Sequence, residues 1–314
     1  MTATLPEPIT EARDLVAPAL RASVARLAAP MRRIAEYHFG WRDADGTELA
    51  GNGGKALRPA LALLGARAVG ADPQCAVPAA VAIELVHNFS LLHDDVMDGD
   101  ETRRHRLTAW RVFGMPAAIL AGDALLTLAV ETARTGCAPE VAGEVIGCLD
   151  ESVQRLIIGQ SSDVDFESRR DVGLQECLRM AADKTGALMR AAMSIGALAA
   201  GADSVKVAAL AEFGEHLGLA FQLVDDLLGI WGSPEVTGKP ALADLASRKK
   251  SVPVVAALNS ATPAGKSLGE SYFSAAESDQ QDLERMAELV EQAGGLSYTE
   301  SEAQRHLQAA RLCL

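Results

Sequence analysis

Two groups of closely spaced acidic residues each follow a long apolar segment. In the first, HDDVMDGDETRR, Asp94, Asp95 and Asp98 stand at positions i, i+1 and i+4. On a helix, Asp94 and Asp98 share one face a turn apart, where like charges repel. A divalent cation removes that repulsion, and magnesium takes a few carboxylate oxygens together with water and substrate phosphates. The spacing favours a magnesium site, with a solvated acidic helix end as the alternative.

The second acidic group is FQLVDDLLG, residues 221–229. Asp225 and Asp226 lie among Leu and Val residues, and a buried acid there needs a positive partner. Gln222, three residues before Asp225, lies on the same helix face. Two such patches, facing each other across a helical bundle, predict a magnesium cluster that binds one diphosphate.

Basic residues accompany the acidic patches. Lys55 and Arg58 stand in GGKALRP at an expected helix start, where free N–H groups and the helix dipole favour an anion. Arg103 and Arg104 directly follow the first patch, and guanidinium groups match phosphate oxygens. Further cations are Lys184, Lys239, Lys249 and Lys250. Each alone is more often a solvated surface residue, so the set argues for phosphate binding only jointly.

The composition indicates a helical protein. Hydrophobic residues make up 49% of the 314 residues and aromatic residues only 4%, with Ala and Leu prominent; these favour helices. The net charge of -13 argues against a nucleic-acid partner and an anionic membrane surface. Five cysteines without a C-x-x-C pair indicate a reduced, cytoplasmic chain.

No targeting or spanning segment is expected. The N-terminal residues lack a basic region followed by an apolar one. The most apolar stretch, Met115 to Val130, contains Asp123 and is too short to span a bilayer. We therefore expect a cytoplasmic protein without a membrane span.

Periodicity predicts helices along most of the chain and no convincing strand. The expected helical ranges are 10–39, about 57–69, 77–98, 116–136, 140–160, 173–200, 204–231, 251–258 and 280–312, with a loop over 40–54. Because no linker divides the chain, we expect a single all-α domain over 1–314, an orthogonal helical bundle with a central active-site cavity.

Seven motifs, in order from about residue 53 to 257, resemble those of the trans-isoprenyl diphosphate synthases, also called polyprenyl synthetases. The motifs are GGKALRP, HNFSLLHDDVMDGDETRR, AGDALL, GQSSDVDFE, DKTGAL, FQLVDDLLG and GKPALADLASRKKSVPV. The resemblance implies a prenyltransferase of the isoprenoid synthase fold, usually a homodimer. Such an enzyme adds isopentenyl diphosphate to dimethylallyl, geranyl or farnesyl diphosphate and forms a linear all-trans product.

The resemblance also implies roles for individual residues. Magnesium, three ions per site, would be bound by Asp94, Asp95, Asp98, Asp225 and Asp226. Isopentenyl diphosphate would be bound by Lys55, Arg58, His87 and Arg104, and the allylic diphosphate by Arg103, Lys184 and Lys239. Thr185 and Gln222 would face the developing carbocation, while Phe221, Asp244 and Lys249 would shape the second patch.

Three departures from the family pattern stand out. Gly229 replaces the third acid of the second patch, which we expect to weaken metal binding without abolishing it. His105 and Leu107 occupy positions that are usually Gly and Pro. The sequence ends at Leu314, whereas many members continue with a further helix and a basic tail; we expect slower turnover or reliance on a partner subunit.

Two residues before the first patch bear on product length. Phe89 and Ser90 stand five and four residues before Asp94, about one turn deeper in the expected tunnel. In the family an aromatic residue at the fifth position limits growth. This combination resembles synthases of the twenty-carbon geranylgeranyl diphosphate, with farnesyl diphosphate as the nearest alternative. Phe89 as an ordinary core residue is nearly as well supported.

Rival interpretations are a terpene cyclase of similar fold and a non-catalytic partner subunit. A cyclase needs no isopentenyl site, so the presence of Lys55, Arg58, His87 and Arg104 opposes it. Partner subunits typically lose the acidic patches, which this chain keeps. A helical scaffold with incidental acids is the weakest alternative.

Overall fold

The computed structural model describes residues 6–49, 54, 56–234, 240–274 and 278–314, and these form helices joined by short turns. The helices group into two compact units. Unit 1 comprises residues 1–153 and 188–214, and unit 2 comprises residues 154–187 and 215–314. The predicted single domain stays a prediction.

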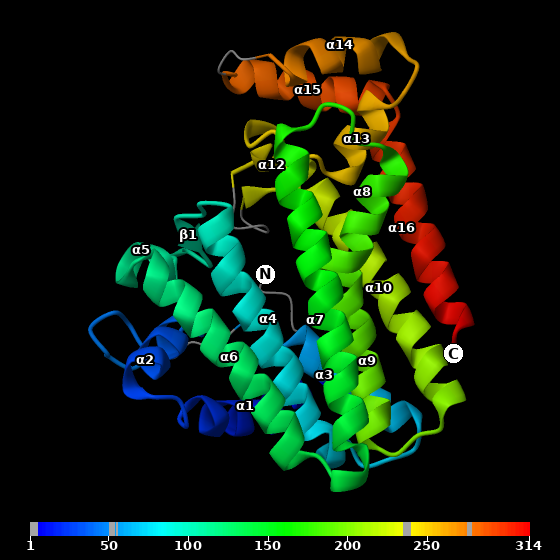
Figure 1. Cartoon of the computed structure of the whole chain (residues 1–314). Helices are drawn as coiled ribbons and strands as arrows, with labels where there is room; N and C mark the ends of the chain where they lie inside the picture. The colour runs from blue at the N-terminus through cyan, green and yellow to red at the C-terminus, as the bar shows by residue number, and fades with distance from the viewer. Residues whose placement is uncertain (1–5, 50–53, 55, 235–239, 275–277) are drawn as a thin grey trace. The chain divides into compact units, whose positions relative to one another are not determined.

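Unit 1 holds the N-terminal helices and a small hairpin (Figure 1). Its elements are α1 (Glu7–Val24), α2 (Ala29–His38), α3 (Leu57–Ala68), the 3-10 helix η1 (Pro73–Ala76), α4 (Val77–Met97), β1 (Thr102–Arg103), β2 (Arg106–Leu107), α5 (Ala109–Phe113) and α6 (Met115–Gly136). Three helices continue from one unit into the other: α7 (Pro139–Ser168), α9 (Ala187–Ala199) and α10 (Ser204–Trp231).

Unit 2 holds the C-terminal helices. Its further elements are α8 (Leu174–Ala181), the π-helix η2 (Ala182–Gly186), α12 (Ala243–Ala246), α13 (Val252–Leu258), α14 (Pro263–Tyr272), α15 (Gln280–Gln292) and α16 (Gly295–Leu312). Helices α14 and α15 pack against each other, and α13 packs against α16 (Figure 1).

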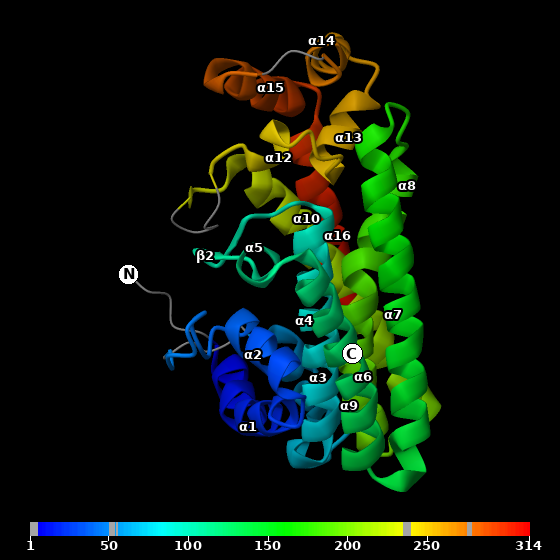
Figure 2. The same cartoon turned by 60° about the vertical axis from the view of Figure 1, so that its left-hand side comes forward.

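Helix α4 is the buried centre of unit 1. It packs mainly against α6, and α1 and α3 cover it from another side (Figure 2). Ile83, Leu85 and Leu92 are fully buried, and almost every residue from Val77 to Leu92 is excluded from water. Such burial contributes about 1.5–3 kcal/mol for each large aliphatic side chain. The core therefore fixes the position of the acidic end of α4.

Glycines allow α3 and α9 to approach closely within unit 1. A Cβ atom at Gly196 would overlap the carbonyl oxygen of Ala62, and one at Gly65 would overlap the carbonyl oxygen of Met193. The two backbones are thus in direct contact, which only glycine permits.

A comparable contact shapes unit 2 around η2. A Cβ atom at Gly159 of α7 would overlap the backbone of Lys184. π-Helical turns are rare and occur most often at functional sites. Here the widened turn carries Lys184 and Thr185, two of the predicted site residues.

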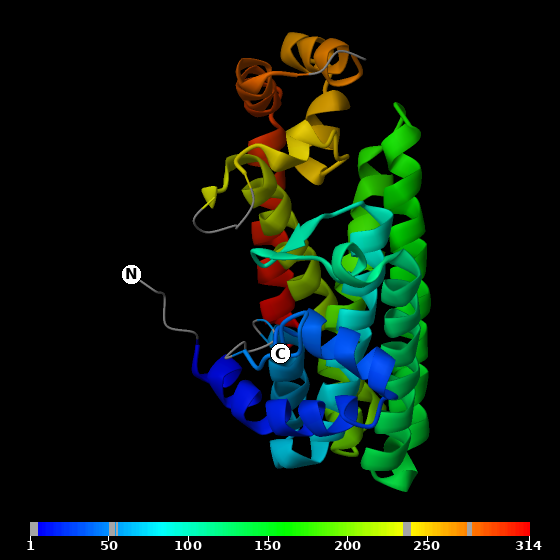
Figure 3. The same ribbon diagram turned by 90° about the vertical axis from the view of Figure 1, so that its left-hand side faces the viewer.

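The all-α prediction is confirmed, while several predicted boundaries were wrong. The predicted helix over 173–200 consists of α8, η2 and α9, and the one over 280–312 is divided at Gly294, whose φ of 88° ends α15. Helix α7 continues to Ser168. Helix α14 was missed because PAGKSLGESY contains two glycines and only two large apolar side chains, Leu268 and Tyr272. The only described strands form the hairpin beside α5, drawn in teal (Figure 3).

Three described helices are long and apolar enough to cross a membrane: Pro73–Met97, Met115–Gly136 and Ser204–Trp231. The prediction that the second of these is too short was wrong, because α6 continues to Gly136 and has 22 residues. In the first helix, 78% of the most apolar window is buried inside the protein. The expected absence of a membrane span stays a prediction.

The close contact of α3 and α9 predicts that Gly196→Ala destabilises the protein. The added methyl group overlaps the backbone of Ala62, so the free energy of unfolding should fall by about 1–3 kcal/mol. Gly147→Ala on α7 is the matched control, since open space surrounds its Cβ position. In this variant the free energy of unfolding should rise by about 0.5–1 kcal/mol. Urea unfolding measures both, and equal effects of the two variants would contradict the close contact.

Candidate active site

The first acidic patch ends helix α4 in unit 1. The backbone N–H of Asp98 donates to the carbonyl oxygen of Asp94 at 2.8 Å, so both residues belong to the last helical turn. Asp94 is half-buried and Asp98 is exposed, whereas Asp95 is only 1% exposed. The patch therefore has an outward pair one turn apart and one inward acid.

Asp95 is paired with an arginine of the hairpin. Arg103 Nε donates to Asp95 Oδ1 at 2.6 Å. Burial raises the pKa of Asp95 to about 6, although Arg103 acts in the opposite direction. Asp95 thus anchors Arg103 to the end of α4, and its predicted role as a magnesium ligand stays a prediction.

The hairpin presents Arg104 in an unusual backbone conformation. Arg104 and His105 form its two-residue turn, with φ angles of 53° and 63°. Turns of this kind favour Asn and Gly because most side chains resist positive φ. The turn is therefore formed despite the departure from Gly at position 105. At the other departure, Leu107, the carbonyl oxygen accepts a 2.8 Å hydrogen bond from Tyr37 Oη.

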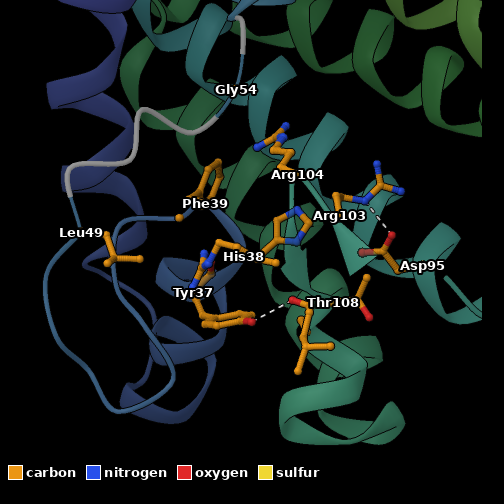
Figure 4. Close-up of a pocket in the computed structure, with 13 residues that line it drawn as sticks. Tyr37, His38, Phe39, Leu49, Gly54, Asp95, Arg103, Arg104 and Thr108 are labelled. Carbon is orange, nitrogen blue, oxygen red and sulfur yellow. Dashed lines mark hydrogen bonds and ion pairs between the residues drawn. The ribbon is translucent and has the colours of Figure 1, made fainter. Parts of the chain in front are cut away.

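A pocket of about 260 Å3 opens between this hairpin and α2 (Figure 4). Its lining includes the cations Arg103, Arg104 and Arg106, with Asp95 the one acid among the lining residues. His38, which the sequence analysis missed, lies beside the arginines (Figure 4), and its buried Nε2 has no hydrogen-bond partner among the described residues. Burial lowers the pKa of His38 to about 3, so its ring is neutral. The pocket is suited to an anion.

Buried charges connect Arg104 with the start of α3. Glu84, one turn before Asn88 on α4, accepts a hydrogen bond from Asn88 Nδ2 at 3.2 Å. Burial raises the pKa of Glu84 to about 7, while the charges of Arg58 and Arg104 lower it. Glu84 therefore lies within electrostatic range of two predicted isopentenyl-binding residues. The sequence signal was an acid within the apolar segment AAVAIELVHNF.

His87 belongs to the same group of side chains. Burial lowers its pKa well below the usual value, and Arg58, Arg104 and Arg103 act in the same direction. A neutral imidazole among three guanidinium groups adds hydrogen-bonding capacity without further repulsion. The structure thus brings together Arg58, His87, Arg103 and Arg104, while Lys55 lies outside the described residues.

In unit 2, a chain of hydrogen bonds links the π-helix to the second acidic patch. Thr185 Oγ1 donates to Gln222 Oε1 at 2.6 Å, and Gln222 Nε2 donates to Asp226 Oδ1 at 2.8 Å. Asp226 Oδ2 accepts from the backbone N–H of Val252 at 2.9 Å. The chain fixes the orientation of the Gln222 amide.

The two acids of this patch differ sharply in exposure. Asp225 is exposed, whereas Asp226 is 4% exposed. Burial raises the pKa of Asp226 to about 6, opposed by Lys249, whose Nζ lies 4.0 Å from Asp226 Oδ1 and 4.0 Å from Asp244 Oδ2. Burial lowers the pKa of Lys249, but the two carboxylates outweigh it and raise that pKa above the usual value. Buried Asp226 therefore holds Gln222 and Lys249 in place beneath the exposed Asp225.

Gly229 leaves room for another carboxylate. A Cβ atom at position 229 would overlap the carboxyl group of Asp244. The space next to α10 that a third acid at 229 would enter is therefore occupied by Asp244, which α12 supplies from later in the chain. The acid that is missing at position 229 is thus replaced in space by Asp244 of the same unit.

Lys184 is held by an acid of the GQSSD motif. Its Nζ lies 2.5 Å from Asp163 Oδ2. Asp163 was not predicted as a site residue, although the motif that contains it was noted. Of the remaining predicted residues, Phe221 is 45% exposed on α10, Phe89 and Ser90 are buried on α4, and Lys239 lies outside the described residues.

The outward carboxylates have the chemistry that magnesium requires. Asp94 and Asp98 share the end of α4, and Asp225 is exposed on α10. Within the described ranges, no group of three or more His, Cys, Asp or Glu side chains is arranged to hold a metal by itself. Carboxylate oxygens are among the ligands that magnesium takes, together with water and substrate phosphates.

Comparisons with known proteins agree on one family. A family model described as polyprenyl synthetase matches residues 43–290. A (2E,6E)-farnesyl diphosphate synthase of Mycobacterium bovis is 49% identical over 301 residues, covering 94% of this chain and 83% of the relative. A geranylgeranyl diphosphate synthase of Mycobacterium tuberculosis is 47% identical over 303 residues, covering 96% and 86%.

A solved structure is equally similar. The crystal structure of a polyprenyl synthetase from Streptomyces coelicolor A3(2) superimposes with a TM-score of 0.93 at 49% sequence identity. The match covers 99% of this chain and 93% of that one.

The buried Glu84 predicts a pH-dependent effect of Glu84→Gln. Its folded pKa is about 7 against an ordinary value of 4.5, so the folded wild type holds a proton that the unfolded chain has released. Wild-type stability therefore falls as pH rises through this window. Relative to wild type, the free energy of unfolding of Glu84→Gln should rise by about 2–3 kcal/mol between pH 5 and 8.

Urea unfolding at both pH values measures this difference. Glu212→Gln, which removes an exposed carboxylate on α10, is the control and should show no comparable trend. If the free energy of unfolding of Glu84→Gln relative to wild type did not change between pH 5 and 8, the raised pKa of Glu84 would be contradicted.

The overlap of Gly229 and Asp244 predicts coupling between the two positions. Gly229→Ala should destabilise unit 2, because its methyl group meets the Asp244 carboxyl group. Adding Asp244→Ala removes the obstacle, so the double variant should be more stable than the sum of the single effects by about 1 kcal/mol. A double-mutant cycle in urea measures the coupling, and strict additivity would contradict the overlap.

Proposed function

The chain belongs to the polyprenyl synthetase family, and on that premise we propose that it joins isopentenyl diphosphate to an allylic diphosphate to form geranylgeranyl diphosphate. The coarser description, a short-chain trans-prenyl diphosphate synthase and hence a prenyltransferase, is that of its relatives. The observation that carries the proposal is the arrangement at α4, a helix that ends in carboxylates and carries His87 near Arg58 and Arg104. One phosphate group can be bound by cations and another through metal.

Isopentenyl diphosphate is bound directly by basic residues. Arg58 and Arg104 supply guanidinium forks for phosphate oxygens, and neutral His87 supplies a ring N–H. Lys55 completes the set in this proposal. When no substrate is bound, the carboxyl group of Glu84 offsets part of the positive charge of Arg58 and Arg104, because burial of a charged group is costly.

Magnesium, three ions per site in this proposal, would be held by Asp94, Asp98 and Asp225, with Asp95 and Asp226 as further predicted ligands. Members of this family use magnesium. When bound, the metal neutralises the charge of the leaving diphosphate. Arg103, Lys184 and Lys239 bind the same allylic diphosphate, and the Asp95 contact sets the position of Arg103.

Thr185 and Gln222 stabilise the positive charge that develops on the allylic carbon. The Thr185 hydroxyl donates a hydrogen bond to Gln222 Oε1. The lone pairs of the Thr185 oxygen therefore remain available to a cation. Asp226 fixes the Gln222 amide from the other side. These oxygen dipoles need no reorganisation when charge appears, which is the most effective form of electrostatic stabilisation.

Phe89 and Ser90 are proposed to set the product length. Phe89 is 6% exposed, and its ring meets the His93 ring edge-on at 4.8 Å. Ser90 donates to the carbonyl oxygen of His87 at 2.8 Å. Farnesyl diphosphate is the second candidate product, because a farnesyl diphosphate synthase is among the relatives at 49% identity.

A cytoplasmic homodimer is part of the proposal. On α6, Met115, Ile119, Leu120 and Val130 expose 38–56% of their surface. Exposed apolar side chains along one helix favour contact with another protein surface. We assign this surface to a second copy of the chain rather than to a membrane.

Replacing Asp94 or Asp225 by Ala should lower kcat by about 10^2–10^3-fold, the cost typical of losing a contact to transition-state charge. Steady-state kinetics with isopentenyl and geranyl diphosphates measures this. Glu212→Ala, an exposed acid on α10, is the control and should keep wild-type turnover. Near-normal rates for either aspartate variant would sink the metal assignment.

Replacing Phe89 by Ala should lengthen the product by at least one five-carbon unit. The ring is buried and its loss costs about 3–5 kcal/mol, so Phe89→Leu serves as a milder second variant. Products are dephosphorylated and identified by gas chromatography with mass spectrometry. Phe273→Ala, an equal truncation in unit 2, is the control, and an unchanged product from both Phe89 variants would assign Phe89 to the core alone.

A further inference from the structure

A second basic pocket lies wholly within unit 2. Its lining includes Lys250, one of the cations singled out in the sequence, but none of the residues to which the family resemblance assigns a role. It has a volume of about 250 Å3 and is formed by the turn after α7, the segment just before α13, helix α13 and helix α14. Arg170 lines it from the turn after α7, Lys250 from just before α13, and Lys266 from α14. Three cations converge here in a protein whose net charge is -13.

Lys250 is the most unusual of the three. It is 5% exposed, and its Nζ donates to the carbonyl oxygen of Arg248 at 3.3 Å. Its Nζ lies 5.7 Å from the ring centroids of both Tyr272 and Phe273. Among the described residues Lys250 forms no ion pair, although a buried ammonium group normally has a carboxylate partner. Burial lowers the pKa of Lys250, and the charge of Glu167 opposes this effect from a distance.

The other two cations are equally available to a ligand. Arg170 donates to the carbonyl oxygen of Phe273 at 3.3 Å, and Lys266 is exposed on α14; neither forms an ion pair within the described ranges. The lining includes one acid, Asp171, which is paired with Arg169 at 3.0 Å. The pocket is therefore positively charged.

Adjacent lysines serve different sites. Lys249 lies 4.0 Å from both Asp226 and Asp244 in the second acidic patch, whereas Lys250 lines this pocket. The backbone between them is fixed, since Tyr272 Oη donates to the carbonyl oxygen of Lys249 at 2.5 Å and Cys177 Sγ to that of Lys250 at 3.2 Å. The basic pocket is thus a separate structure from the candidate active site.

The rest of the lining indicates the ligand class. Val172, Val255 and Leu258 supply apolar surface, and Phe273 supplies an aromatic ring. The volume fits a diphosphate group with a short hydrocarbon chain at most. We propose that this pocket binds the diphosphate group of a small metabolite directly through Arg170, Lys250 and Lys266, without a metal ion.

Isothermal titration calorimetry of the whole protein in EDTA tests the proposal, with inorganic diphosphate and isopentenyl diphosphate as probes. The identity of these probes rests on the proposed function, whose own anion site depends on Arg104. Wild type should bind two anions per chain. Lys266→Ala, on the surface, should weaken one of them at least tenfold, and Arg104→Ala should weaken the other; Lys250→Met should reproduce the Lys266 effect.

Lys206→Ala, which removes an exposed lysine of α10, is the matched control and should bind like wild type. If Lys266→Ala and Lys250→Met both bound the anions as wild type does, or if Lys206→Ala weakened binding equally, the proposal that this pocket binds diphosphate would be overturned. The separate anion site at Arg104 would be unaffected by either result. Tighter binding of isopentenyl diphosphate assigns the pocket to a prenyl ligand, and tighter binding of inorganic diphosphate assigns it to the released product. Sulfate that binds as tightly as either probe would overturn the diphosphate assignment.

Discussion

Carboxylates at the ends of long apolar helices impose the main constraint on this protein, because an ionised acid excluded from water needs a positive partner. In unit 1, Asp95 is 1% exposed and accepts a hydrogen bond from Arg103 at 2.6 Å. In unit 2, Asp226 is 4% exposed and lies 4.0 Å from Lys249. Each acid fixes the position of a predicted site residue, since Asp95 holds Arg103 of the hairpin and Asp226 holds the amide of Gln222.

The need for a positive partner separates the two acids of each adjacent pair, Asp94 with Asp95 and Asp225 with Asp226. Asp94 and Asp225 face outward with oxygens suited to a metal, whereas Asp95 and Asp226 face inward and support the surrounding residues. The same logic explains Gly229, because Asp244 fills the space of the absent acid and shares Lys249 with Asp226. From the sequence alone, Gly229 indicates weaker metal binding because an acid is missing. In the structure, the carboxylate of Asp244 occupies the space of that missing acid.

The sequence predicts well those features that depend on local spacing. Helix α4, the acidic end at Asp94 to Asp98 and the motif order are readable because helical periodicity and residue type are local. The contact of Asp244 with Gly229 joins residues fifteen positions apart through a loop, and the π-helical turn at Lys184 depends on Gly159 of another helix. Glu84 and His38 become functional candidates only when burial is known.

The most direct test of the account is the reaction itself. Wild-type protein is incubated with magnesium, isopentenyl diphosphate and, separately, the five-, ten- and fifteen-carbon allylic diphosphates, and the dephosphorylated products are identified by gas chromatography with mass spectrometry. The account predicts a linear twenty-carbon alcohol from every starter, and no product when EDTA replaces magnesium. A cyclic hydrocarbon, or no elongation of any starter, would contradict it.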